Sequence, residues 1–219
     1  MITYQEIKKN AAIQEYIKKA DESLLSLGYT EHSFAHVEKV AQTVEQILSR
    51  LNYSSHDIEL GKIAGYMHDI GNLVNRVDHS QSGALMAFRI LDRLGMPPSD
   101  IAMIVTAIGN HDEGTGVPVN PIAAALILAD KSDVRRNRVR NRDVTSFDIH
   151  DRVNYSVTDS HLTISEDKEE IFLTITIDTE YGSVMDYFEI FMARMILCRK
   201  AAARLGLRFR LVINGQTLL

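Results

Sequence analysis

Histidine and aspartate residues recur along the first part of the chain, and their types and spacing suggest metal chemistry. His68 and Asp69 are adjacent near the end of the apolar segment 63–72. Neighbouring helix residues point about 100° apart, so the pair could reach one metal ion beside a helix end or bridge two ions. Gly71 stands where a left-handed residue often ends a helix, and we expect it to end the helix there.

Further donors of the same kind occur near the ends of other expected helices, namely His36, His79, His111 and Asp130. Each histidine taken singly is more often a structural residue than a ligand. Taken together, imidazole and carboxylate donors suit iron, manganese, nickel, cobalt or zinc, and the lack of cysteine among them argues against a structural zinc site. Four histidines and two aspartates exceed the needs of one catalytic ion and fit two ions that share Asp69. We therefore predict that the protein binds two divalent transition-metal ions, with iron or manganese as the favoured metals and nickel, cobalt or zinc as alternatives.

The elements that must position these donors have the periodicity of helices. Apolar residues recur at helical spacing, and we expect helices over residues 4–27 (one or two helices), from about 33 to 51, 56–70, 79–95, 98–109 and 121–131. Thr3 and Glu6 have the spacing of a capping box. Residues 122–129 are apolar nearly all round, which indicates a central buried helix. The carboxylate of Asp130, at the end of this buried helix, needs a partner that compensates its charge, and a cation would do so.

The pattern changes from about residue 152. Residues 171–177 alternate as in a strand, a weaker strand lies near 162–164, a helix is expected over about 183–205, and a last strand over 208–213. The expected fold is therefore mainly α, a helical metal-binding domain over residues 1–150 followed by a small β-β-α-β module over residues 151–219. Residues 135–150 read as an exposed junction. The module could mediate homodimer formation or cover the active site.

The overall composition excludes few functions. The chain has 219 residues, 45% of them hydrophobic, and a net charge of −5, which gives no general reason to bind nucleic acid or an anionic membrane. The N-terminus does not resemble a signal peptide, and the apolar run 121–129 is too short to span a bilayer. The single cysteine, Cys198, fits a reducing compartment, so we expect a cytoplasmic protein.

The order and spacing of the donors resemble the HD-domain superfamily of metal-dependent phosphohydrolases. The resemblance covers roughly residues 30–136. His32-x-x-x-His36-Val-x-x-Val-Ala is similar to the first-ligand helix, residues 64–71 (Ala-Gly-Tyr-Met-His-Asp-Ile-Gly) to the His-Asp signature, and residues 129–133 (Ala-Asp-Lys-Ser-Asp) to the closing aspartate. The resemblance implies the helical bundle of that family.

His79 and His111 are similar to the additional histidines of binuclear HD proteins, and the nearest resemblance is to bacterial symmetrical diadenosine tetraphosphate hydrolases. Residues 110–118 also resemble HD-GYP cyclic dinucleotide phosphodiesterases. They depart from that pattern because Asn110 replaces the first of two paired histidines and the tyrosine of Gly-Tyr-Pro is absent. This departure argues against activity on cyclic di-GMP.

The resemblance also implies a role for each donor. One ion would be held by His36, His68, Asp69 and Asp130, and the second by Asp69, His79 and His111. Asp112 would either add a ligand or orient His111, of which we expect the second. His32 would line the pocket or support a ligand rather than bind metal itself. A water between two ions about 3.5–4 Å apart would have its pKa lowered to about 7 and attack phosphorus. Asp69 is thus a catalytic residue.

Basic residues after Asp130 are the candidate phosphate clamps. Lys131, Arg135 and Arg136 are the candidates, whereas Arg138, Arg140 and Arg142 read as a solvated charged loop. We expect the remaining polar candidates to be solvated surface residues: His56, Asp78, His150 and His161.

Three functions remain open on the sequence. The first is hydrolysis of a small-molecule phosphate substrate, a nucleotide-type phosphoester or phosphoanhydride. The second is a diiron oxygenase acting on a small anionic substrate, because some HD-fold proteins of that class use the same six ligands. The third is a sensor or scaffold with a vestigial site, against which the complete donor set argues.

Overall fold

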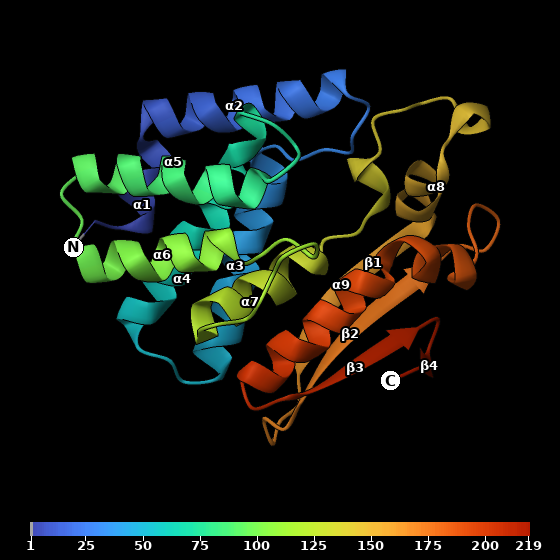
Figure 1. Cartoon of the computed structure of the whole chain (residues 1–219). Helices are drawn as coiled ribbons and strands as arrows, with labels where there is room; N and C mark the ends of the chain where they lie inside the picture. The colour runs from blue at the N-terminus through green and yellow to red at the C-terminus, as the bar shows by residue number, and fades with distance from the viewer. Residues whose placement is uncertain (1) are drawn as a thin grey trace.

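Capping residues define the helices of the N-terminal bundle in the computed structural model, which describes residues 2–219 (Figure 1). The helices are α1 (Tyr4–Lys9), α2 (Ala11–Ser26), α3 (Phe34–Arg50), α4 (Ser55–Met67), the 3₁₀ helix η1 (Ile70–Leu73), α5 (His79–Arg93), α6 (Pro98–Gly109) and α7 (Pro121–Lys131). Thr3 and Glu6 form the predicted capping box, with the Thr3 hydroxyl accepting from the Glu6 amide. The predicted helical bundle is confirmed.

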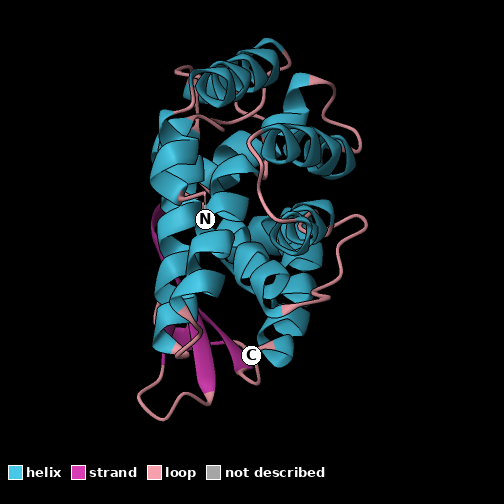
Figure 2. Cartoon of the chain, turned by 90° about the vertical axis from the view of Figure 1, so that its left-hand side faces the viewer, coloured by secondary structure: helices cyan, strands magenta, loops and turns pink. Residues whose placement is uncertain are grey.

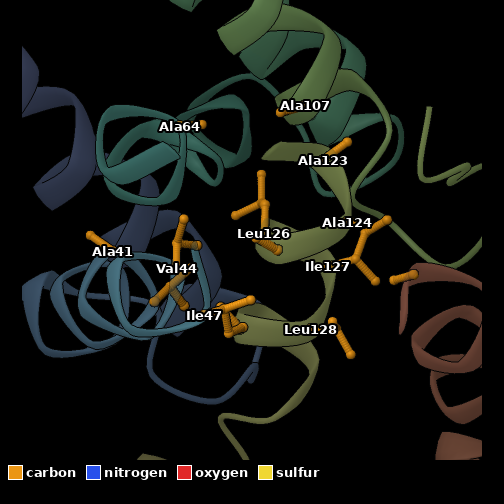
Figure 3. Close-up of a cluster of buried hydrophobic side chains, with 14 of the residues drawn as sticks. Ala41, Val44, Ile47, Ala64, Ala107, Ala123, Ala124, Leu126, Ile127 and Leu128 are labelled. Carbon is orange, nitrogen blue, oxygen red and sulfur yellow. The ribbon is translucent and has the colours of Figure 1, made fainter. Parts of the chain in front are cut away.

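Helix α7 is the centre of the bundle, as its apolar sequence predicts. Residues 122–129 are all buried. The helix packs against α3, α4 and α6, and against helix α9 (Val184–Arg204) of the C-terminal part. Figure 3 shows Leu126 of α7 beside Val44 of α3, with alanines on α4 and α6 close by. The small side chains at these contacts let the helices pack closely. The C-terminal end of α7 lies near the ends of the neighbouring helices.

The C-terminal part forms a sheet covered by one long helix. Its elements are the 3₁₀ helices η2 (Arg136–Arg138) and η3 (Val144–Ser146), α8 (Ile149–Ser156), β1 (Val157–Ile164), β2 (Glu170–Ile177), α9, β3 (Arg208–Ile213) and β4 (Gln216–Thr217). The strand order is β1-β2-β3-β4; β2 and β3 are parallel and the other two pairs are antiparallel. Figure 2 shows the strands at one end of the molecule. The predicted β-β-α-β module is therefore present.

Four elements of the C-terminal part were not predicted from the sequence: η2, η3, α8 and β4. Helix α8 is short and mostly polar, and the other three have only two or three residues each. Strand β1 also starts at residue 157, well before the expected 162, because polar side chains of an edge strand obscure its alternation. The expected division between residues 150 and 151 falls inside α8, and it stays a prediction.

Helix α9 lies between the sheet and α7 (Figure 1). Its buried residues Phe191, Met195 and Cys198 belong to the same apolar core as α7. The C-terminal part is thus packed against the bundle rather than tethered to it. Among residues 2–219, no helix has the length and apolarity that crossing a bilayer requires.

Gly71 does not end helix α4, and the expected left-handed cap is wrong. Helix α4 already ends at Met67, and Gly71 lies inside η1 without a positive φ. A Cβ on Gly71 would lie 1.9 Å from the carbonyl oxygen of His79 and 2.5 Å from the amide nitrogen of Gly83. The glycine is needed because η1 and the start of α5 touch through their backbones, which brings His79 towards Asp69.

Replacing this glycine should therefore be costly. We expect Gly71→Ala to destabilise the fold by about 1–3 kcal/mol or more, since the new methyl group must push α5 away. Gly109→Ala is the matched control, because its Cβ would find no atom nearer than 3.6 Å. The control should change stability by less than about 1 kcal/mol. Urea denaturation of both variants measures the difference, and equal stabilities would contradict the backbone contact.

Candidate metal centre

The six predicted donors come together where the helices end. His36 is in the first turn of α3, His68 and Asp69 follow α4 directly, and His79 is the first residue of α5. His111 lies just beyond α6, and Asp130 is next to the last residue of α7. All are buried except Asp130, which is slightly exposed. Five separate segments therefore deliver their polar side chains to one point inside the bundle.

Four of these residues form a first group of donor atoms. His36 Nε2 lies 3.3 Å from His68 Nε2, 3.5 Å from Asp69 Oδ2 and 3.4 Å from Asp130 Oδ1. His68 Nε2 lies 3.2 Å from Asp69 Oδ2 and 3.6 Å from Asp130 Oδ1. Donor atoms about 2.1 Å from a shared ion lie about 3.0–3.4 Å apart in octahedral or tetrahedral geometry. The group therefore has the spacing of a metal site.

A second group lies on the other side of the Asp69 carboxylate. His79 Nε2 is 3.2 Å from His111 Nε2 and 3.5 Å from Asp69 Oδ1, and His111 Nε2 is 3.9 Å from the same oxygen. The two oxygens of Asp69 thus face different groups, Oδ2 towards His36 and His68 and Oδ1 towards His79 and His111. A carboxylate in this position can bind two cations at once.

Each histidine is oriented by the ring nitrogen that does not face the centre. His36 Nδ1 lies 2.8 Å from the Asp133 carboxylate. The other three imidazoles place Nδ1 against backbone carbonyl oxygens: His68 on Gly65 at 2.8 Å, His79 on Arg76 at 3.1 Å, and His111 on Ile108 at 2.6 Å. A carbonyl or carboxylate at Nδ1 requires the proton there and leaves Nε2 as the free donor. All four histidines are therefore prepared to bind metal.

Electrostatics at the centre favour a cation. Burial alone would raise the pKa of Asp69, but His68 and His36 hold that pKa well below its usual range. Burial would likewise lower the pKa of His68, yet the carboxylates of Asp69 and Asp130 outweigh it and raise the pKa to about 10. Positive charge is thus required beside these carboxylates, and a metal ion can supply it in place of protons. Metal binding should release protons and weaken as the pH falls.

The donor set fits divalent transition-metal ions on these grounds. Its atoms are imidazole nitrogens and carboxylate oxygens with ligand spacing, and burial lowers the pKa of His111 so that its imidazole is neutral and able to coordinate. The chain therefore has His/Asp groups capable of binding divalent metal.

A cavity of about 420 Å³ opens onto the centre. The bundle lines it with Asp69, His79, His111 and Asp130 at the inner end and with the α2–α3 connection at the outer end. The C-terminal part contributes Asn154 of α8 and Phe191 and Arg194 of α9 to the lining. The lining carries four basic residues, Arg76, Lys131, Arg138 and Arg194, and five acidic ones, Asp69, Glu113, Asp130, Asp148 and Asp151. Divalent cations at the centre would turn the balance positive, and the cavity would then suit an anionic molecule.

The three basic residues that were expected to bind phosphate have other partners in the structure. Arg135 is not among the described residues that line the cavity; its guanidinium donates to Asp133 and lies 3.4 Å from Glu31. Arg136 donates to the Tyr155 carbonyl and to Asp178. Lys131 does line the cavity, but its Nζ already lies 2.8 Å from Asp130 and 2.6 Å from Glu113. Its ammonium group neutralises carboxylates beside the centre.

Other expectations for polar residues also change. Arg138 is not solvated: it is buried, and it donates to the backbone carbonyls of Glu31 and Asp133. His150 is exposed, as expected, and it also lines the cavity. Asp112 does not orient His111, whose Nδ1 faces Ile108; Asp112 Oδ1 lies 3.9 Å from His79 Nε2. His32 lies in the cavity wall, as expected of a pocket residue.

Sequence reasoning gave no role to four residues that shape the site. Asp133 and Glu113 each follow a ligand within three positions, which was an available signal. Asp133 orients His36, and Glu113 lies between Lys131 and Arg194. Arg76, near His79, and Arg194, on α9, carried no signal of this kind, because only folding brings them to the cavity.

Comparison with known proteins identifies relatives. The model of the HD domain family matches residues 33–153, more than half of the chain. Uncharacterized protein MJ1020 of Methanocaldococcus jannaschii is 24% identical over 160 residues, which cover 63% of this chain and 61% of that protein. The chain thus spans less than two thirds of that relative. The crystal structure of a predicted HD superfamily hydrolase from an uncultured Thermotogales bacterium is 24% identical, with a TM-score of 0.45 over 57% of this chain and 67% of that one.

Asp133 should matter for metal affinity although it is not a ligand. In Asp133→Asn the charged acceptor of the His36 Nδ1 proton is lost, and we expect metal affinity to fall about 10- to 100-fold. The control is Lys39→Gln, which removes an exposed partner of Asp133 and leaves the His36 contact intact. The control should stay within about twofold of the wild type. Calorimetric titration with Mn²⁺ measures both, after thermal melting has shown that they fold; unchanged affinity in Asp133→Asn would refute this role.

Proposed function

The chain belongs to the HD domain family, and we propose that it is a metal-dependent phosphohydrolase acting on a nucleotide-type phosphoester or phosphoanhydride. The observation that carries the proposal is the position of Asp69, whose two carboxylate oxygens face separate groups of imidazole donors. This arrangement supports two ions sharing one bridging ligand. The four basic side chains of the cavity, together with the ions, support an anionic substrate.

Two ions at this centre would act as Lewis acids on a phosphoryl oxygen and make a water nucleophilic near neutral pH. The first ion would be held by His36, His68, Asp69 and Asp130, and the second by Asp69, His79 and His111. The chain's own part is to keep the donors oriented and the carboxylates ionised. Arg76 and Arg138 on the cavity surface would attract the phosphate and offset its charge.

A diiron oxygenase is the second candidate, since its ligands would be the same. The observation that favours it is the abundance of imidazole: four histidines and two aspartates suit iron well. The basic side chains of the cavity are compatible with an anionic oxygenase substrate too. Only a measurement of the reaction separates the two functions.

The bridging role of Asp69 predicts how many ions each variant retains. We expect the anaerobically purified protein to hold about two ions per chain, His79→Ala about one, and Asp69→Ala almost none. The exposed histidine of β1 provides the control, because His161→Ala removes an imidazole far from these donors and should keep the full content. Elemental analysis gives the counts. Retention of both ions by Asp69→Ala would contradict the shared ligand.

The reaction itself is tested by phosphate release. With Mn²⁺ or Fe²⁺ bound, the protein should release phosphate from p-nitrophenyl phosphate or from a nucleotide in a substrate screen. Asp69→Ala should lower the rate by at least about 100-fold, because the ions and the attacking water are lost together, whereas His161→Ala should keep the wild-type rate. Oxygen consumption without phosphate release would overturn the proposal and favour the oxygenase.

A further inference from the structure

One of the three arginines that line the cavity comes from α9, in the C-terminal part of the chain. This residue, Arg194, contacts none of the metal donors. We propose that Arg194 binds a second phosphate of the substrate, next to the one that reacts at the metal centre. The substrate class is then a phosphoanhydride or another compound with two neighbouring phosphates, and this inference rests on the proposed function.

Arg194 is held firmly in place before any ligand binds. Its Nε donates to Glu113 Oε1 at 2.9 Å, and its guanidinium carbon lies 4.2 Å from the centre of the Phe191 ring. Only 23% of the side chain is exposed. A guanidinium fixed by a hydrogen bond and an aromatic ring loses little conformational entropy when it binds an anion.

The outer edge of this guanidinium has no partner. Within residues 2–219, its one hydrogen bond uses Nε, and both terminal nitrogens remain free for a ligand in the cavity. Both terminal nitrogens are open to solvent, so an anion in the cavity can reach them. Two parallel N–H donors match two phosphate oxygens, which is why arginine binds phosphate in a bidentate manner.

The other cations of the cavity lie closer to the metal centre. Lys131 contacts Asp130, and a terminal nitrogen of Arg76 lies 3.3 Å from His79 Nε2. Arg138 donates to the backbone carbonyls of Glu31 and Asp133. Arg194 contacts none of the six donors and is thus the cation best placed to bind an anion beyond the reacting phosphate.

The contacts of Arg194 point to a phosphate other than the reacting one. Within residues 2–219, its guanidinium pairs with Glu113 and with none of the six donors, whereas Lys131 pairs with Asp130 directly. A phosphate bound by Arg194 would therefore differ from the one held at the ions.

A purely structural role for Arg194, as the partner of Glu113, makes a different prediction. Loss of a structural residue would weaken the binding of every anion and lower stability. Loss of a phosphate-binding residue would weaken only ligands that have the second phosphate. Comparison of inorganic phosphate with inorganic pyrophosphate separates these two roles.

The test is calorimetric titration of the Mn²⁺-loaded full chain with each anion. We expect the wild type to prefer pyrophosphate, and Arg194→Gln to lose about 10- to 100-fold of its pyrophosphate affinity while phosphate affinity stays within about twofold. Arg194→Lys should recover part of the loss, because it restores charge without the planar pair of donors. Arg199→Gln, an exposed arginine on the same helix, should match the wild type. Chelation of Mn²⁺ by pyrophosphate is common to all four proteins and cancels in the comparison.

Equal pyrophosphate affinity in Arg194→Gln and wild type, or an equal loss for both anions, would overturn the inference. Phosphate release from ADP and from p-nitrophenyl phosphate tests this inference and the proposed function separately. If Arg194→Gln loses ADP hydrolysis but keeps p-nitrophenyl phosphate hydrolysis, the result supports both the inference and the proposed function. Arg194-dependent pyrophosphate binding without hydrolysis of any substrate would refute the proposed function alone. Hydrolysis by the wild type without any effect of Arg194 on pyrophosphate would refute this inference alone.

Discussion

The need to balance charge inside the bundle governs this structure. Asp69 and Asp130 bring two carboxylates to the ends of buried helices, where an unpaired charge is costly. Four imidazoles surround them, each fixed through Nδ1, so that the nitrogens facing the carboxylates can accept a cation. The polar interior is tolerated because positive charge lies beside the carboxylates, either as protons on His36 and His68 or as metal ions in their place.

Helix ends supply this organisation with little cost to the core. The apolar length of α7 fills the middle of the bundle, and its last turn delivers Asp130 and Lys131 to the centre. The contact between η1 and α5 works in the same way, since Gly71 allows two backbones to touch and places His79 beside Asp69. The donors are therefore held by packed helices, and their spacing follows from the packing.

The helical bundle and the set of metal donors could be predicted from the sequence, because both depend on local sequence patterns. Every metal donor is near an expected helix end, and the composition of the set indicates its chemistry before any fold is known. The bundle, the central helix α7 and the β-β-α-β order followed from periodicity in the same way. Arg194 and Arg76 could not be found, because their role depends on which surfaces pack together. Arg135 and Arg138 were misjudged since a basic run does not reveal which side chains turn inward. Gly71 was misread because a glycine required for a close contact looks the same as one required for a turn.

The wall of the cavity and the metal donors come from different stretches of the chain. All six donors lie between residues 36 and 130, whereas Asn154, Phe191 and Arg194 belong to the helices that follow. Variation in α8 and α9 could therefore alter which molecule fits the cavity while the donors stay unchanged. In evolution, or in the laboratory, one reactive centre could be adapted to new substrates by changes confined to the last third of the sequence.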